Sequence, residues 1–242
     1  MKKFNLTILG LAFLLFSACN KETTADKSRV TNYPLITVDG DNVVFVPQGG
    51  TYTDPGVSAT ENGAEIEVTT SVSGAYRGGS SLDLSKADCY DITYTATNAD
   101  GFNGSSGRRV YVVETGDMVN SIAGLYTSTI VRNGTLKFTD LEYVLVWKNE
   151  DGTYEFSCGF GGYYEIGTGY GLGYKSGGCV VTATSIPLNT YSITDFSNDG
   201  FGGAVTDAKL TADPVTKTLN LTSEWSAGIG YSFDVELTQV AL

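Results

Sequence analysis

The sequence predicts an all-β protein built from two successive antiparallel units. From Leu35 onward, apolar and polar side chains alternate in short runs, and Gly, Asn, Asp or Pro separates each run from the next. No stretch has the apolar spacing of an amphipathic helix of useful length. We therefore expect a β-sandwich over residues 35–115, and an antiparallel meander barrel or a second sandwich over residues 122–242.

Residues 1–18 have the parts of a secretory signal peptide. Lys2 and Lys3 precede a mainly apolar run from Phe4 to Phe16, and the small residues Ser17 and Ala18 follow it. The apolar run is too short to span a membrane as a mature helix. We expect the chain to be exported and cleaved after residue 18.

Cys19 stands directly after the small pair, and the segment resembles a bacterial lipobox, with Phe16 where the motif usually has Leu. The resemblance implies that the Cys19 thiol is acylated and that Cys19 becomes the first mature residue. Two or three acyl chains, at about 0.8 kcal/mol per buried CH₂, anchor a protein stably. The alternative is an ordinary signal peptide followed by an incidental cysteine.

Charge limits the partners of the mature chain. Without its signal peptide the chain has 224 residues, of which 13 are Lys or Arg and 27 are Asp or Glu, a net charge of −14. Such a surface repels nucleic acid and anionic headgroups, so we expect no nucleic-acid partner and a membrane attachment through lipid alone. Residues 19–34 comprise the lipidated cysteine and a polar stretch without apolar periodicity, which predicts a flexible stalk.

The first unit has about 80 residues and six or seven short strands, which is typical of an immunoglobulin-like sandwich. In Asp88-Cys89-Tyr90 the tyrosine has the spacing of a tyrosine corner, whose phenol hydrogen-bonds back to nearby backbone. The expected strands are 35–38, 42–46, 65–71, 82–84, 90–97 and 108–114.

Two motifs relate this unit to a known family. They are Gly49-x-x-Tyr52-x-Asp54-Pro55-Gly56-Val57 and Tyr90-x-Ile92-x-Tyr94-x-Ala96-x-Asn98, followed by Gly101 and Arg108-x-Val110-x-Val112. In these motifs the unit resembles the bacterial surface-protein Ig-like domain family. The resemblance implies a spacer or adhesive module that carries no catalytic residues. The sequence departs from the family at Gly63-Ala64-Glu65-Ile66, where an acidic turn is usual, and at Cys89.

The second unit offers eight to ten strands in about 120 residues. Asn133-Gly134 and the turn at 149–152 predict hairpins. A closed or nearly closed meander hides the sheet edges, which favours a lipocalin-like barrel or a sandwich. The expected strands are 124–132, 142–148, 153–158, 179–184, 190–196, 205–211, 218–224 and 231–238.

The whole arrangement is similar to uncharacterised surface lipoproteins of Bacteroides-type bacteria. Its parts are the lipobox, the Ig-like unit and a β-rich unit that ends in Tyr231-x-Phe233-x-Val235-x-Leu237. Because several such lipoproteins accompany outer-membrane glycan-capture machinery, the resemblance implies that context. It also implies an outer-membrane location with the protein facing the cell exterior. Asn20-Lys21-Glu22 only partly resembles the acidic surface-export tag of those bacteria.

The segment 159–178 is unusual because it holds nine glycines and four tyrosines. If it is a strand, one face is bare glycine, and a flat group can approach it closely. That group is either an aromatic side chain such as Trp147 or Trp225 inside the barrel, which is the commoner arrangement, or a sugar ring. For a saccharide platform, the candidate ligand-binding residues are Tyr163, Tyr164, Tyr170, Tyr174 and Trp225.

Three cysteines remain once Cys19 is assigned to lipid. Cys158 and Cys179 are the candidate disulfide, which would close a glycine-rich loop and stabilise the fold by roughly 3 kcal/mol. The alternative is that Cys89, Cys158 and Cys179 are all buried free thiols that behave as small hydrophobes.

Several chemistries are disfavoured. The chain has no histidine, which removes the commonest general base and transition-metal ligand. The turn at 195–200 lacks the glutamate of a calcium loop, since Thr206 stands at that position. The carboxylates that could form a glycosidase pair are Glu142, Glu155, Glu165, Asp195 and Glu224, but nothing in the sequence sets two of them opposite each other. We therefore predict no enzyme, no catalytic residues, no metal and no cofactor.

Two functions remain. The first is a non-catalytic, envelope-anchored module that binds glycans in polysaccharide capture. The alternative is a structural or accessory subunit that docks onto an outer-membrane transporter or another protein.

Overall fold

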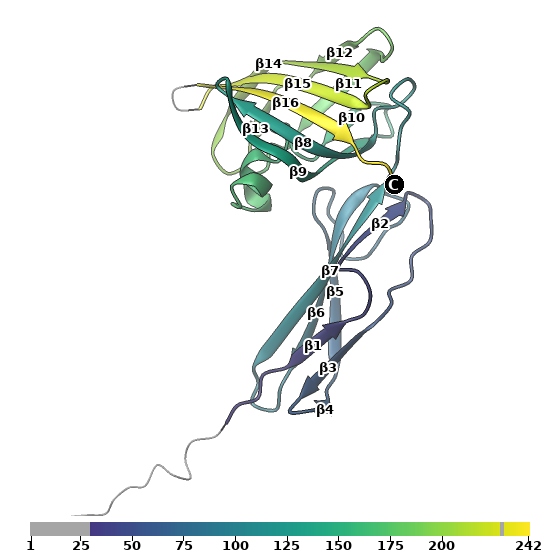
Figure 1. Ribbon diagram of the computed structural model, residues 1–242, viewed down its shortest axis with the longest axis vertical. Helices are drawn as coiled ribbons and strands as arrows, with labels where there is room; N and C mark the ends of the chain where they lie inside the picture. The colour runs from purple at the N-terminus through teal and green to yellow at the C-terminus, as the bar shows by residue number, and fades with distance from the viewer. Residues whose placement is uncertain (1–29, 228–229) are drawn as a thin grey trace, which may run out of the picture.

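Figure 1 shows a computed structural model that describes residues 30–227 and 230–242. These residues form a β-sandwich and, beyond it, a larger curled sheet, so the all-β prediction is confirmed. The signal peptide predicted over 1–18, the lipidation at Cys19 and most of the predicted stalk lie outside the described residues. Within the described part of the chain, no helix has the length and apolar character needed to cross a membrane.

The sandwich consists of a three-stranded and a four-stranded sheet. The first has the order β1-β3-β4, with β1 (Leu35–Val38), β3 (Val57–Glu61) and β4 (Ala64–Glu65). The second has the order β2-β7-β6-β5, with β2 (Val43–Pro47), β7 (Asn103–Val113), β6 (Asp88–Thr97) and β5 (Val68–Gly74). β2 runs parallel to β7, and the other pairs are antiparallel.

The core of the sandwich follows from the alternation in its strands. In β6, Tyr90, Ile92, Tyr94 and Ala96 are buried, whereas the residues between them are more exposed. They pack with side chains of the opposite sheet such as Val57. The period-two pattern therefore places one face of β6 in the core, as expected for a half-buried strand.

The tyrosine corner is confirmed. The buried Tyr90 donates a hydrogen bond from its hydroxyl to the carbonyl oxygen of Asp83, at 3.1 Å. Asp83 lies in a loop, so the strand predicted over 82–84 is wrong, and β3 was missed. Leu82 and Leu84 of this loop pack against the core, while Asp83 between them accepts the hydrogen bond from Tyr90. The segment therefore has the alternating apolar residues of a strand, although it pairs with no strand.

The Tyr-x-Asp-Pro-Gly motif closes one loop onto the sandwich. The carboxylate of Asp54 accepts hydrogen bonds from the Gly56 N–H, at 2.9 Å, and from the Tyr94 hydroxyl, and it lies 3.6 Å from the guanidinium of Arg108. Burial alone would raise the pKa of Asp54, but the bonds from Tyr94 and Gly56 hold it below its ordinary value. The motif therefore has a structural role.

The curled sheet has nine strands in the order β12-β11-β10-β9-β8-β16-β15-β14-β13, and every pair is antiparallel. β12 also lies against β14, so the two edges approach each other (Figure 1). The predicted strand over 190–196 is broken in two. The strands are β8 (Gly124–Arg132), β9 (Thr135–Lys148), β10 (Tyr154–Phe156), β11 (Cys179–Ser185), β12 (Thr190–Ile193), β13 (Phe196–Asn198), β14 (Gly202–Asp213), β15 (Thr218–Trp225) and β16 (Tyr231–Gln239).

A continuous apolar cluster joins the sandwich to the curled sheet. Cys89 and Tyr111 of the sandwich pack with Leu125, Leu145 and Trp147 of the sheet. All five side chains are buried, and the chain ends beside this joint (Figure 1). Trp147 therefore faces the sandwich and does not cover the glycine-rich segment.

Candidate functional site

The glycine-rich segment is not a strand. Tyr163–Gly167 forms a π-helical turn, η3, and Leu172–Tyr174 forms a single 3₁₀ turn, η4. Gly162, Gly169 and Gly171 have φ values of +83°, +73° and +84°, which L-residues rarely adopt and which interrupt an extended chain. The conditional expectation of a strand with one bare glycine face is therefore wrong.

Glycines of this region nevertheless allow aromatic rings to lie directly on the backbone. A Cβ atom on Gly159 would lie 2.4 Å from the ring of Phe196, and one on Gly167 would lie 2.6 Å from the ring of Phe138. Gly200, in the turn after β13, would bring a Cβ within 2.3 Å of the ring of Tyr174. These glycines thus make room for aromatic side chains of the protein itself, which is the first of the two arrangements expected from the sequence.

Three of the five predicted platform residues lie in the core. Tyr163, Tyr164 and Trp225 are buried and pack around Phe233. The guanidinium of Arg132 lies 4.8 Å from the centre of the Tyr163 ring and donates a hydrogen bond of 3.2 Å to the Tyr164 hydroxyl. Together, Tyr163, Tyr164 and Trp225 form an aromatic floor at one end of the curled sheet.

The other two predicted residues reach solvent and meet a third ring. Tyr170 is 55% exposed, Phe201 is 48% exposed and Tyr174 is half-buried. The Phe201 ring centre lies 5.9 Å from that of Tyr170 and 4.9 Å from that of Tyr174. We call Tyr170, Tyr174 and Phe201 the aromatic patch.

The aromatic patch rests on the aromatic floor. The rings of Tyr170 and Tyr164 are stacked with centres 6.3 Å apart, and Phe201 lies 6.3 Å from Trp225. Phe201 was not among the candidate binding residues predicted from the sequence. Its position among Gly200, Gly202 and Gly203 could have indicated an exposed ring, since an apolar side chain in a glycine-rich turn is not placed to enter the core.

A buried amide holds the two segments of the aromatic patch in register. The side-chain amide of Asn198 donates a hydrogen bond of 2.7 Å to the carbonyl oxygen of Tyr174. Its carbonyl oxygen accepts one of 2.9 Å from the N–H of Phe201. An ion pair between Lys175 and Asp199 lies beside it and supplies polar groups next to the exposed rings.

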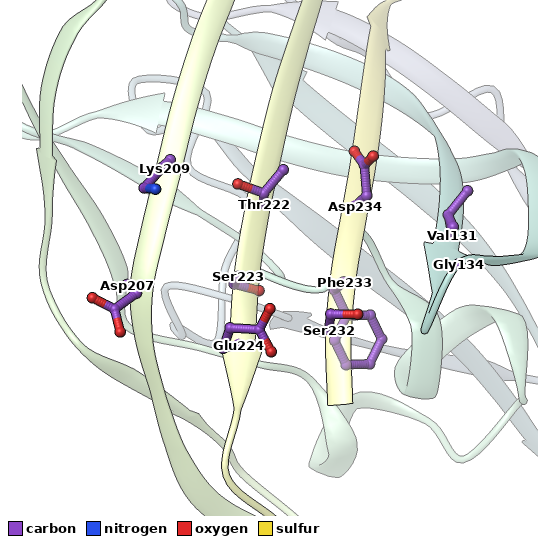
Figure 2. Close-up of a pocket in the computed structure, with 10 residues that line it drawn as sticks. All are labelled: Val131, Gly134, Asp207, Lys209, Thr222, Ser223, Glu224, Ser232, Phe233 and Asp234. Atoms are coloured by element: carbon purple, nitrogen blue, oxygen red, sulfur yellow. The ribbon is translucent and has the colours of Figure 1, made fainter. Parts of the chain in front are cut away.

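Figure 2 shows a second candidate, a shallow polar hollow of about 400 Å³ on the outer faces of β8, β14, β15 and β16. In β14 the register shifts between Thr206 and Lys209, and Asp207 within this bulge, with φ +53°, lines the hollow. Charged side chains line the hollow, but Phe233 belongs to the core, so no aromatic ring faces a ligand there. The hollow offers hydrogen bonds without a stacking surface.

The five carboxylates considered for catalysis are dispersed, with one exception. Glu142 and Glu165 both line a cavity of about 200 Å³ between the sandwich and the curled sheet, and Glu224 lines the polar hollow. Among residues 30–227 and 230–242, no three His, Cys, Asp or Glu side chains gather in a way that could hold a metal ion.

The candidate disulfide is not formed. Cys158 and Cys179 are buried free thiols, as is Cys89. The sulfur of Cys158 accepts a hydrogen bond of 3.3 Å from the N–H of Ser176, and burial raises the pKa of its thiol to about 11. These cysteines behave as small core residues, which is the second alternative drawn from the sequence.

Comparison with known proteins defines the class. Residues 36–112 match the bacterial surface protein, Ig-like domain, and residues 115–239 match a family model described as "-like, C-terminal domain". The second match covers more than half of the chain, so the chain belongs to the family that this C-terminal domain defines, and it carries a bacterial surface Ig-like domain in front of it.

The solved structures that match include a lipoprotein that is similar over most of the chain. The lipoprotein BT2262 from Bacteroides thetaiotaomicron is 25% identical, with a TM-score of 0.64, and the alignment covers 86% of this chain and 100% of that chain. None of the curated proteins matches the chain. The resemblance to Bacteroides surface lipoproteins is therefore confirmed.

Proposed function

We propose that this protein is a lipid-anchored, non-catalytic lipoprotein of the outer bacterial surface, and that it binds a glycan through the aromatic patch. The observation that carries the binding proposal is the exposure of Tyr170 and Phe201 above a buried layer of aromatic rings. Aromatic faces stack on the C–H faces of sugars, and neighbouring polar groups bind the hydroxyls. Here, Lys175 and Asp199 are those neighbours.

A fixed geometry supports the same proposal. The patch rings lie on Tyr164 and Trp225, and Asn198 bonds both segments that carry them. Rings that are already ordered lose little conformational entropy when a ligand stacks on them. The aromatic patch is therefore better suited to a sugar than the polar hollow of Figure 2, which lacks a stacking ring.

The anchoring proposal rests on the lipobox-like segment at Cys19 and on similarity to a lipoprotein. The chain enters the sandwich at the end remote from the curled sheet (Figure 1). A lipid at Cys19 would therefore leave the sandwich as a spacer between the membrane and the aromatic patch. Mass spectrometry of the native protein tests this part: acylation at Cys19 is expected, and an unmodified amino terminus would contradict it.

A glycan array with a soluble form that starts at Lys21 tests the binding proposal. We expect binding to one class of glycan, and a loss of about tenfold or more in affinity for Tyr170→Ala and Phe201→Ala, because each change removes a stacking face. Tyr33→Ala is the matched control, since Tyr33 is a 64% exposed ring in the sandwich, outside the aromatic patch.

A blank array, or binding that survives both patch substitutions, would refute glycan recognition by the aromatic patch. Crosslinking of Tyr170 and Phe201 to one outer-membrane protein in cells, together with a blank array, would instead establish the accessory-subunit alternative.

A further inference from the structure

The cavity between the sandwich and the curled sheet contains an unsatisfied buried group. Glu165, on η3, is 8% exposed and lines this cavity. Its Oε1 atom accepts a hydrogen bond of 2.9 Å from the hydroxyl of Tyr76, but its Oε2 atom is buried without a partner among the described residues. A buried carboxyl oxygen without a donor is costly, so the site is incomplete.

The charges around Glu165 favour a cation as the missing partner. Lys175 and Arg109 both lower the pKa of Glu165, but each is already paired with a carboxylate. Arg109 pairs with Asp91, at 2.8 Å, and Lys175 pairs with Asp199. A further carboxylate, Glu142, lines the same cavity. In and around the cavity, the carboxylates thus outnumber the cations Arg109 and Lys175, and the resulting negative potential attracts positive charge. The carboxylates are those of Glu165, Glu142, Asp91 and Asp199.

The remaining lining selects the kind of cation. Tyr76 and Tyr111 contribute aromatic rings, and Ile166 and Leu172 contribute apolar surface. The described residues hold no cluster of three metal-ligating side chains, so a divalent metal ion lacks its ligands here. Aromatic rings beside a carboxylate are the usual environment of organic ammonium groups.

We propose that this cavity binds a small alkylammonium ion, with its N–H groups bonded to Glu165 and its hydrocarbon part against Tyr76 and Tyr111. The cavity, with a volume of about 200 Å³, has room for a small amine. The ammonium belongs to a free amine or to the ethanolamine headgroup of a lipid.

The ionisation of Glu165 gives the proposal a second signature. Burial raises the pKa of Glu165 to about 7, although Tyr76, Lys175 and Arg109 lower it. Asp91, Cys89 and Tyr111 face the same cavity from the sandwich, and burial raises the pKa values of Cys89 and Tyr111 as well, so these two stay neutral. Only the ionised carboxylate binds an ammonium strongly.

Isothermal calorimetry of the soluble form with ethylammonium chloride tests the proposal. We expect saturable binding with a Kd in roughly the millimolar range, which is the tightest that a ligand of three non-hydrogen atoms can reach. Ethanol, the neutral analogue, should not bind. Affinity should fall about 30-fold between about pH 8.5 and about pH 5.5, because the ionised fraction of Glu165 falls by that factor. Ethanolamine and phosphatidylethanolamine vesicles then separate the free amine from the lipid headgroup.

Glu165→Gln should weaken ethylammonium binding at least tenfold at about pH 8.5. Glu155→Gln is the matched control, since Glu155 is a half-buried carboxylate of β10 that does not line the cavity. If Glu165→Gln does not fold, the pH dependence of ethylammonium affinity in the unchanged protein still tests whether the carboxylate binds the ammonium. No binding, equal binding of ethanol, or an affinity independent of pH would each overturn the proposal.

Discussion

The hydroxyl of Tyr76 and the carboxyl group of Glu165 meet across the joint between the sandwich and the curled sheet, 2.9 Å apart. Tyr76 also stacks on Trp147, with ring centres 6.5 Å apart. Glu165 belongs to the same short segment as Tyr164 of the aromatic floor and Tyr170 of the aromatic patch. The segment thus connects the joint, the core and the exposed surface within a few residues.

Stability should fall as pH rises through neutrality, because of Glu165. Its pKa is about 7 in the folded protein and near 4.5 in the unfolded chain, so the folded state binds the proton more tightly. This contribution is fully present below about pH 4.5 and is lost as pH rises through 7. Between about pH 5 and about pH 8.5, the free energy of unfolding should decrease by on the order of 2 kcal/mol from this group.

Urea unfolding at several pH values measures this effect when Glu165→Gln is compared with the unchanged protein. The substitution removes the titration, so the variant should show a shallower decline with pH. Parallel pH profiles for the two proteins would show that Glu165 titrates normally and that its burial has no energetic consequence.

Asp54→Ala should destabilise the protein strongly. The substitution leaves the guanidinium of Arg108, whose side chain is fully buried, without its counter-ion, and it removes an acceptor from Tyr94. Loss of one partner of a fully buried ion pair costs about 3 kcal/mol or more, and because the side chain of Asp54 is one-third exposed we expect a loss of about 2 kcal/mol. Thermal or urea unfolding measures the loss.

The neighbouring pair of Arg109 and Asp91 provides the control. These side chains pair at 2.8 Å between β6 and β7, and both are about half exposed, whereas the side chain of Arg108 is fully buried. Asp91→Ala should therefore cost less than about 1 kcal/mol. If Asp54→Ala and Asp91→Ala lower the free energy of unfolding equally, the buried Arg108 does not depend on Asp54 as its counter-ion.

Gly200→Ala should disturb the aromatic patch without straining the backbone. A Cβ atom at this position would lie 2.3 Å from the ring of Tyr174, so the ring must move. We expect a loss of about 1 to 3 kcal/mol and changed chemical shifts for Tyr174 and Phe201. Gly173→Ala is the control, because a Cβ atom there meets nothing within 4 Å. If both variants behave alike, the contact between ring and glycine is not needed for the patch.

Alternation of side chains was sufficient to predict the fold but not the site. The strand over 124–132 was predicted with its observed bounds, because its alternating residues bury one face against the core. The segment at 159–178 also alternates, with glycine at every second position from 167 to 173, yet it coils. Alternation predicts a strand when side chains can be buried on one face, and glycine has none to bury.

The exposed rings were predicted only in part for a related reason. Tyr163 and Tyr170 are the same residue type and each follows a glycine, but Tyr163 packs under Arg132 and Tyr170 faces solvent. That difference depends on β8 and on the turn after β13, both far away in the sequence. Phe201 belongs to the turn after β13 and directly follows residues 195–200, which were considered from the sequence only as a calcium loop.

All three cysteines of the folded units should be inert until the protein unfolds. Cys89, Cys158 and Cys179 are buried free thiols, and burial raises the pKa values of Cys89 and Cys158 to about 12 and about 11. Because the thiolate is the reactive form, a thiol reagent should label none of them in the native soluble form that starts at Lys21, and all three in denaturant without reductant. Labelling of only Cys89 in denaturant would instead establish the Cys158–Cys179 disulfide, since that bond would withhold two thiols from the reagent.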